Sequence, residues 1–120
     1  MNLQSLDYDG IIGKTLKIVP EIKEPFEKEN TQWTEEKMGP YNLFDIVLMP
    51  WVIAILSEKG RDEDLLRVFG FFEALAGHPK QDIRDLIGVA VCETLVCDEA
   101  ALQRSVKFMG PRLKPSATCS

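Results

Sequence analysis

The sequence predicts an all-α protein of five to six helices stacked as antiparallel hairpins, either HEAT-like or as an irregular bundle. Three observations lead to this fold class. Apolar residues recur at helical spacing along most of the 120-residue chain. The alternating pattern of half-buried strands is absent, and no Asn-Gly or Asp-Gly turn joins two strand-like runs. Finally, the joining segments after residue 58 are short, which makes consecutive helices antiparallel neighbours.

Length and composition indicate a single domain spanning residues 1–120, with frayed tails at 1–10 and 114–120. The apolar share of 45% and charged share of 28% are typical of soluble globular domains. The longest apolar run, 46–56, is about half of the roughly 20 residues that a bilayer span needs. Without a signal-peptide pattern, and with only three Cys, we expect a cytoplasmic protein with no membrane partner.

The first third of the chain predicts two helices that prolines interrupt. Apolar spacing over residues 11–16 indicates a short helix, which Pro20 ends. Ile22 and Phe26 continue the i, i+4 spacing, but Pro25 lies between them. The second helix is therefore either kinked or begins near Pro25.

A third helix is predicted from Asn42 almost to Gly60, which closes it. Asn42 is the expected N-cap, with Asp45 three residues later as an imperfect capping box. Pro50 lies inside this helix and should kink it. Because residues 46–56 are apolar nearly all round, we expect this helix to be deeply buried.

One apolar face predicts the next helix, between Asp62 and Gly77. Asp62 is its expected N-cap, and Gly77 followed by Pro79 is a stop signal. The residues of the face fall at i, i+3, i+4, i+7, i+10 and i+11. They are Leu65, Val68, Phe69, Phe72, Leu75 and Ala76.

The last two helices follow directly. One stripe of the first is formed by Ile83, Leu86, Ile87, Ala90, Val91 and Leu95. A second stripe holds Val89, Cys92 and Val96, and a helix that is apolar on two sides is expected to have neighbours on both. Asp98 is the expected cap of the final helix, which Gly110 ends. Its predicted inner face carries Leu102, Val106 and Met109.

Few residues of the chain suit catalysis or metal binding. His78 is the only histidine, and no Ser lies in a Gly-x-Ser-x-Gly motif, so a catalytic triad is not expected. Cys92 and Cys97 are spaced unlike the Cys-x₂-Cys pairs of zinc sites, and we interpret them as reduced thiols. The sequence therefore predicts no enzyme activity, no metal and no cofactor.

The acidic segment 21–36 is the most informative feature for function. It holds six Glu against two Lys and so carries −4 of the net charge of −5, which also argues against a nucleic-acid partner. Either it is a solvated surface that maintains solubility, or it is a docking surface for a basic partner. Aromatic residues beside the Gly39-Pro40 turn either anchor this loop to the core or contact that partner. The candidate partner-binding residues are Glu21, Glu24, Glu27, Trp33, Glu35, Glu36, Tyr41 and Asp45.

Several short motifs resemble a family of small, all-helical bacterial immunity proteins encoded beside polymorphic or contact-dependent toxins. The resemblance covers about residues 11–113, and its most specific part is the Met-Gly-Pro that follows the last helix. It is carried by residues 18–23, the Glu-rich stretch ending near Trp33, and residues 38–41, 43–50, 64–73 and 106–111.

The resemblance implies a protein that binds and neutralises a cognate toxin domain, possessing neither catalytic activity nor a cofactor. We expect the toxin to have a basic, nuclease-like surface, which the acidic segment would complement. The sequence predicts no oligomeric state. An alternative interpretation is a HEAT-like adaptor or scaffold module of a larger complex. It rests on the turn and helix of residues 75–95, where Ile83-Arg84 resembles the opening of an inner HEAT helix.

Overall fold

Six continuous helical segments, and no strand, form the part of the chain described by the computed structural model, which covers residues 3, 5–31, 38–110 and 113. This confirms the all-α prediction. The segments are η1 and α1 (Tyr8–Gly10, Ile11–Ile18), η2 and α2 (Pro20–Ile22, Lys23–Asn30), α3, η3 and α4 (Pro40–Asn42, Leu43–Leu48, Met49–Leu56), α5 (Asp62–Ala76), α6, η4 and α7 (Gln81–Leu86, Ile87–Cys92, Glu93–Val96), and α8 and η5 (Glu99–Ser105, Val106–Phe108).

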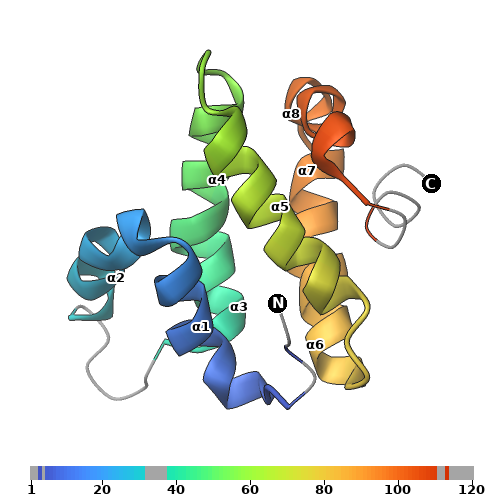
Figure 1. The fold of residues 1–120 in the computed structure, drawn as a ribbon. Helices are drawn as coiled ribbons and strands as arrows, with labels where there is room; N and C mark the ends of the chain where they lie inside the picture. Colours follow the sequence, from blue (N-terminus) through green and yellow to red (C-terminus); the bar gives the residue numbers. More distant parts are fainter. Residues whose placement is uncertain (1–2, 4, 32–37, 111–112, 114–120) are drawn as a thin grey trace.

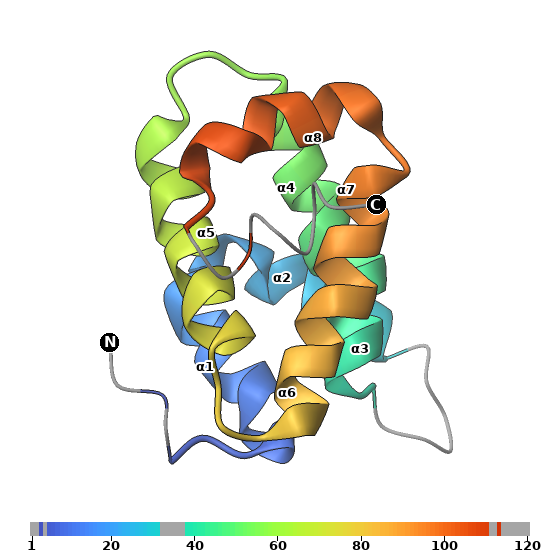
Figure 2. The same cartoon turned by 90° about the vertical axis from the view of Figure 1, so that its right-hand side faces the viewer.

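The long segments alternate in direction, as the short loops predict. The helix α3–η3–α4 runs up, α5 runs down and α6–η4–α7 runs up again (Figure 1). The helix α8 crosses over the upper ends of this group and contacts both α4 and α7 (Figure 2). Segments α1 and α2 pack on the side where α5 and η3 lie. None of the described helices combines the length and the apolar character needed to cross a membrane.

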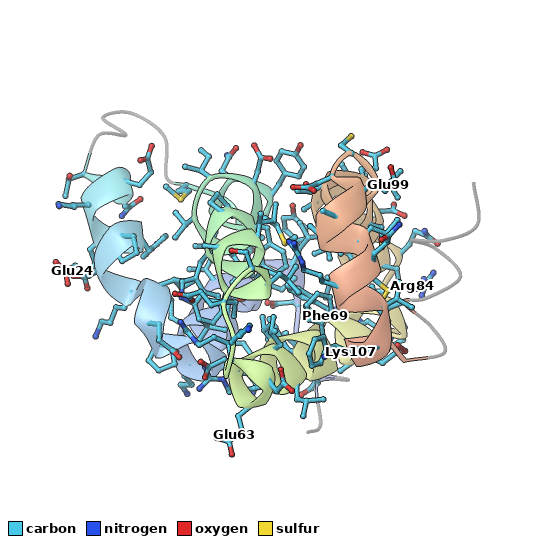
Figure 3. The ribbon with its side chains drawn as sticks, turned by 90° about the horizontal axis from the view of Figure 1, so that it is seen from above. Glu24, Glu63, Phe69, Arg84, Glu99 and Lys107 are labelled. Carbon is cyan, nitrogen blue, oxygen red and sulfur yellow. The ribbon has the colours of Figure 1, made fainter. Side chains whose placement is uncertain are left out.

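A cluster of phenylalanines holds the helices together. Phe72 of α5 is fully buried, and its ring centroid lies 5.3 Å from that of Phe69 in an edge-on arrangement and 5.9 Å from that of Phe44 on η3. Phe108 of η5 stacks on Phe69 at 6.2 Å. Edge-on and tilted aromatic pairs add to the free energy gained from apolar burial. The cluster therefore joins three helical segments, and Phe69 lies between the helices in Figure 3.

Both prolines of the first third lie where helices tolerate them. Val19 leaves the helical conformation, so α1 ends at Ile18 as Pro20 predicts. Pro25 is the third residue of α2, where a backbone N–H would have no acceptor within the helix. The second of the two predicted possibilities, a helix that begins near Pro25, is therefore confirmed.

The helix α3–η3–α4 differs from its prediction in three ways. It begins at Pro40, not after an Asn42 cap, since proline is favoured at the first helical position. It contains a π-helical stretch in which the Met49 N–H bonds to the Phe44 carbonyl, five residues back, directly before Pro50. It is also not buried all round, because Ile46, Pro50 and Ala54 form an exposed stripe.

The helices α5 and α8 agree more closely with the sequence. The helix α5 begins one residue before expectation, with Arg61 and not Asp62 at the N-cap position, and it ends before Gly77. The Asp98 carboxylate accepts a hydrogen bond from the Ala101 N–H at 3.1 Å, which confirms this cap. The inner face of α8 is shifted, however. Ala101 and Ser105 are buried, whereas the predicted Leu102 and Val106 are only half-buried, and only Met109 of the predicted face is buried.

Within the described residues, the helix α6–η4–α7 does not have neighbouring helices over both of its predicted apolar stripes. Val89 and Val96 of its second predicted stripe are 44% and 49% exposed, and only Cys92 is buried. The helix is π-helical from Ile87 to Cys92, and the Glu93 N–H bonds to the Gly88 carbonyl. The first predicted stripe is confirmed, since all of its residues are buried, namely Ile83, Leu86, Ile87, Ala90, Val91 and Leu95.

Part of the N-terminal segment, where the sequence predicted a frayed tail over 1–10, packs on the domain. Leu3 is buried, and its carbonyl accepts a 2.7 Å hydrogen bond from Nε2 of His78. Nδ1 of His78 accepts a 3.0 Å hydrogen bond from the Lys80 N–H, which assigns the ring proton to Nε2. The other predicted tail, 114–120, lies outside the described residues.

Candidate functional site

A surface hollow of about 370 Å³ lies where three distant segments of the chain meet. Tyr8 comes from η1, Tyr41 from α3, and the remaining wall from α6 and the start of η4. The residues of this wall are Asp82, Asp85, Leu86 and Val89. The hollow thus combines two phenol rings, two carboxylates and two aliphatic side chains, and we call it the tyrosine hollow.

Local hydrogen bonds hold two of the three segments that form the tyrosine hollow. The Asp7 carboxylate accepts from the Gly10 N–H at 2.9 Å and so caps the short helix that carries Tyr8. On α6, the side-chain amide of Gln81 donates to Asp85 at 2.6 Å. The Arg84 guanidinium donates to the carbonyl oxygen of Gln81's side chain and to the backbone carbonyl of His78, each at 2.6 Å. These bonds fix the orientation of α6 against the turn that precedes it.

The electrostatics of the tyrosine hollow are acidic. Burial raises the pKa of the Tyr8 hydroxyl, and the nearby Asp82 carboxylate raises it further, while a backbone hydrogen bond from Tyr41 acts in the opposite direction. The four ion pairs between described residues use Arg61 and Arg67 as their cations, and none involves Asp82 or Asp85. Asp82 and Asp85 are exposed, and neither takes its cation from these ion pairs, although Asp85 accepts the hydrogen bond from Gln81.

Apolar side chains are exposed on α3–η3–α4 and α6–η4–α7, the two long helices that contribute to the tyrosine hollow. Tyr41 is 41% exposed and Val89 is 44% exposed, and both line the tyrosine hollow. Ile46 on η3 and Val96 on α7 are also exposed. The two π-helical stretches, η3 and η4, pack against each other beside this region. Because π-helical turns are frequent at functional sites, this part of the surface is the strongest candidate for a binding site.

The structure separates the sequence-predicted binding residues. Tyr41 lines the tyrosine hollow, and Asp45 is exposed on η3 but does not line it. Glu21, Glu24 and Glu27 are exposed on η2 and α2, and Figure 3 shows Glu24 pointing away from the body on the side opposite Arg84 and Glu99. Trp33, Glu35 and Glu36 lie outside the described residues, and α2 ends at Asn30, so a helical face shared with Glu35 is not observed.

One of the predicted acidic residues has an internal partner. The Glu21 carboxylate accepts a 2.6 Å hydrogen bond from the Arg67 guanidinium of α5, and Arg67 also contacts Asp64 at 3.1 Å. Glu21 thus joins η2 to α5. The docking interpretation stays a prediction for this residue as for Glu24, Glu27, Glu35 and Glu36.

Sequence reasoning missed five of the six residues that line the tyrosine hollow. Tyr8 fell in the expected tail, and the hydrogen bond between Leu3 and His78 that holds this segment joins residues 75 positions apart. Val89 belonged to a second apolar stripe of its predicted helix. One stripe is enough to face the core, so the second stripe was a signal of exposed apolar surface. The other missed residues are Asp82, Asp85 and Leu86.

A second hollow, of about 260 Å³, lies at the α4–α5 turn. Gly60 in this turn has φ +79, the left-handed conformation that favours glycine. The hollow brings together both signs of charge, since Lys59, Arg104 and Lys107 face Glu58 and Asp62. Glu58 already pairs with Arg61 at 2.7 Å. The mixture gives this surface no preference for one sign of ligand.

The thiols have contrasting environments. Cys92 is buried, and burial, with a smaller effect of Glu93, raises its pKa to about 11. Cys97 is exposed at the end of α7. Within the described ranges, no three Cys, His, Asp or Glu side chains gather as a metal site would require. Cys92 therefore belongs to the core and is protonated at neutral pH.

Comparison with known proteins identifies a family. No curated protein and no solved structure matches the chain. A family model described as a domain of unknown function, DUF7674, matches residues 12–117, and this range includes every residue of the tyrosine hollow except Tyr8. The description names no activity, ligand or partner. Since the matched range covers most of the sequence, the chain belongs to the DUF7674 family.

Proposed function

We propose that the protein is a non-catalytic immunity protein, which binds a cognate toxin domain in the cytoplasm and blocks its active site. The observation that carries the binding role is the tyrosine hollow, where exposed Tyr41 and Val89 adjoin two carboxylates. Aromatic anchors with polar surroundings are typical of the residues that dominate protein–protein binding energy. The assignment to toxin neutralisation rests on the resemblance of the sequence motifs to immunity proteins.

The distribution of charge supports a basic partner. The hollow presents Asp82 and Asp85, and α2 presents Glu24 and Glu27 on a separate exposed surface. Negative surfaces accelerate the association of positively charged partners and select them by charge. Toxins that attack nucleic acids have positive clefts for the phosphate backbone, so an acidic binding protein could occupy such a cleft.

The use of the histidine also favours binding over catalysis. His78 is the only histidine of the sequence, and it is 2% exposed. One ring nitrogen donates to the Leu3 carbonyl and the other accepts from the Lys80 N–H. A general base needs a nitrogen free to reach a substrate proton, and this ring has both nitrogens engaged in holding the fold.

Co-expression with the toxin domain encoded beside the gene tests the proposal. We expect the protein to restore growth and to form a stable complex with the toxin, detected by size-exclusion chromatography. Val89→Glu places a charge on the exposed wall of the hollow and should abolish both effects. Leu66→Glu is the matched control, because Leu66 is 58% exposed on α5 and does not line the hollow.

Two outcomes would contradict the proposal. In the first, the toxin kills cells that contain the soluble, folded protein, and no complex forms at micromolar concentration. In the second, the protein forms stable complexes with several unrelated purified proteins, which would favour the adaptor interpretation. If Leu66→Glu abolishes protection and Val89→Glu does not, binding takes place on another surface than the hollow.

A further inference from the structure

We propose that the tyrosine hollow is the socket for one arginine side chain of the partner protein. The guanidinium would contact the Asp82 and Asp85 carboxylates and a tyrosine ring, while its aliphatic stem would pack on Leu86 and Val89. That the arginine belongs to a protein rests on the proposed function. The chemistry of the socket is independent of it and can be tested without the partner.

The carboxylates give the socket its preference for a cation. Neither Asp82 nor Asp85 pairs with Arg61 or Arg67, the cations of the ion pairs found between described residues. Arg84 is on the same helix, but its guanidinium donates to the carbonyls of His78 and Gln81. A cation of the partner can therefore pair with these carboxylates without displacing any of these three arginines.

The aromatic and aliphatic walls favour arginine over other cations. A planar guanidinium stacks on aromatic rings and donates two parallel hydrogen bonds to a carboxylate, which the ammonium of lysine cannot do. Cation–π contact with a tyrosine adds to this attraction. The apolar stem of the arginine can lie on Leu86 and Val89, which are adjacent on the wall of the hollow.

The other charged surfaces do not offer this combination. The hollow at the α4–α5 turn has Lys59, Arg104 and Lys107 in its wall beside two carboxylates, so its charge does not favour a guanidinium. The exposed carboxylates of Glu24 and Glu27 lie on α2 and do not line either hollow. Both regions therefore serve as internal controls for a titration that maps the binding site.

The test is an NMR titration of the full-length protein with a blocked tripeptide, acetyl-Gly-Arg-Gly-amide. We expect the largest amide shift changes at Tyr8, Tyr41 and residues 82–89, and none at Lys59 or Lys107. The same tripeptide with citrulline, which has the shape of arginine without its charge, should bind at least about tenfold more weakly because it loses the charge-assisted hydrogen bonds. Free arginine carries a carboxylate that the two aspartates repel, so it should bind more weakly than the blocked peptide.

Matched variants separate charge at the socket from charge elsewhere. The double variant Asp82→Asn/Asp85→Asn should weaken binding of the arginine peptide about tenfold or more, since two carboxylates are lost. Glu24→Gln removes one carboxylate from α2 and should leave this affinity unchanged. Unchanged dispersion of the amide spectrum verifies that each variant is folded.

Three results would overturn the socket. They are equal binding of the citrulline peptide, shift changes that map to another surface, and wild-type affinity in the double aspartate variant.

The failure of the socket is distinguishable from the failure of the proposed function. An arginine peptide that binds as expected to a protein that neutralises no toxin contradicts only the function. A toxin complex that keeps its affinity in the double variant contradicts only the socket.

Discussion

The helices α5 and α6–η4–α7 are neighbours of similar length, yet they place their apolar residues differently. The helix α5 is α-helical throughout and turns a full set of large side chains inward, with Phe69, Phe71 and Phe72 all completely buried. The helix α6–η4–α7 changes to π-helical geometry in its middle and leaves Val89 and Val96 on the surface. Leu66 of α5 is also exposed, at 58%, but it does not line the tyrosine hollow, whereas Val89 does.

Apolar periodicity predicts the main buried face of both helices, and the two differ in the apolar residues that lie outside this face. In α5 every residue of the predicted face is buried or half-buried. In η4 the wider turn and the exposed Val89 coincide with the tyrosine hollow.

Removing the central ring of α5 should have the largest effect on stability. Phe72 is fully buried and lies within 6.4 Å, centroid to centroid, of three other phenylalanine rings. Phe72→Ala should lower the free energy of unfolding by about 3–5 kcal/mol through lost burial and the cavity that remains. Urea denaturation followed by circular dichroism measures this loss.

Val89→Ala is the matched change on the other helix, and it should alter the free energy of unfolding by no more than about 0.5 kcal/mol. Val89 is 44% exposed, so its truncation opens no cavity in the core. Losses of equal size in the two variants would contradict this difference in burial.

The second largest loss of stability is expected at the turn between α5 and α6. His78→Ala removes the donor to the Leu3 carbonyl and the acceptor for the Lys80 N–H, and it leaves buried polar groups unpaired. We expect a loss of about 2–3 kcal/mol, with faster hydrogen exchange at Leu6 and Tyr8 as the N-terminal segment detaches. Lys80→Ala keeps the backbone N–H and is the control. Unchanged exchange at Tyr8 in His78→Ala would show that other contacts hold this segment.

A smaller effect is expected from the thiol in η4 at high pH. The pKa of Cys92 is raised from 9.0 to about 11 in the folded protein, so the unfolded chain loses this proton first as the pH rises. The resulting stability is fully present below pH 9 and is lost progressively as the pH rises towards 11, by about 1 kcal/mol at pH 10.

Denaturation of the wild type and Cys92→Ala at pH 8 and pH 10 isolates this effect, because all other titrating groups are shared. We expect the difference in free energy of unfolding between the two proteins to decrease at pH 10. A constant difference would show that the Cys92 thiol titrates alike in the folded and unfolded chains.

Local signals predicted the regular helices well. The all-α class, the Asp98 cap, the stop at Gly77 and the break before Pro20 follow from contacts within a few residues, which sequence spacing represents directly. The π-helical stretches were not predictable in this way. Pro50 indicated a distortion, but whether the chain kinks or widens depends on how η3 and η4 pack together.

The candidate site was predicted less completely than the fold. Tyr41 was identified from its place beside a turn, which is a local property. Its partners Tyr8 and Asp82 come from segments that join it only through tertiary contacts, and no spacing rule connects residues so far apart in sequence. The acidic segment attracted attention through its charge, but in the structure Glu21 pairs with Arg67, a pairing across 46 positions.

The bond between Leu3 and His78 ties the N-terminal segment to the turn that precedes α6. One side of the tyrosine hollow is carried by Tyr8, which follows the segment that this bond anchors, and the opposite side follows His78 itself. If this bond opens, we expect the segment that leads to Tyr8 to loosen while the phenylalanine core is kept. Recognition at this surface would then discriminate between complete molecules and those with a detached N-terminal segment, even when their overall helix content is nearly the same.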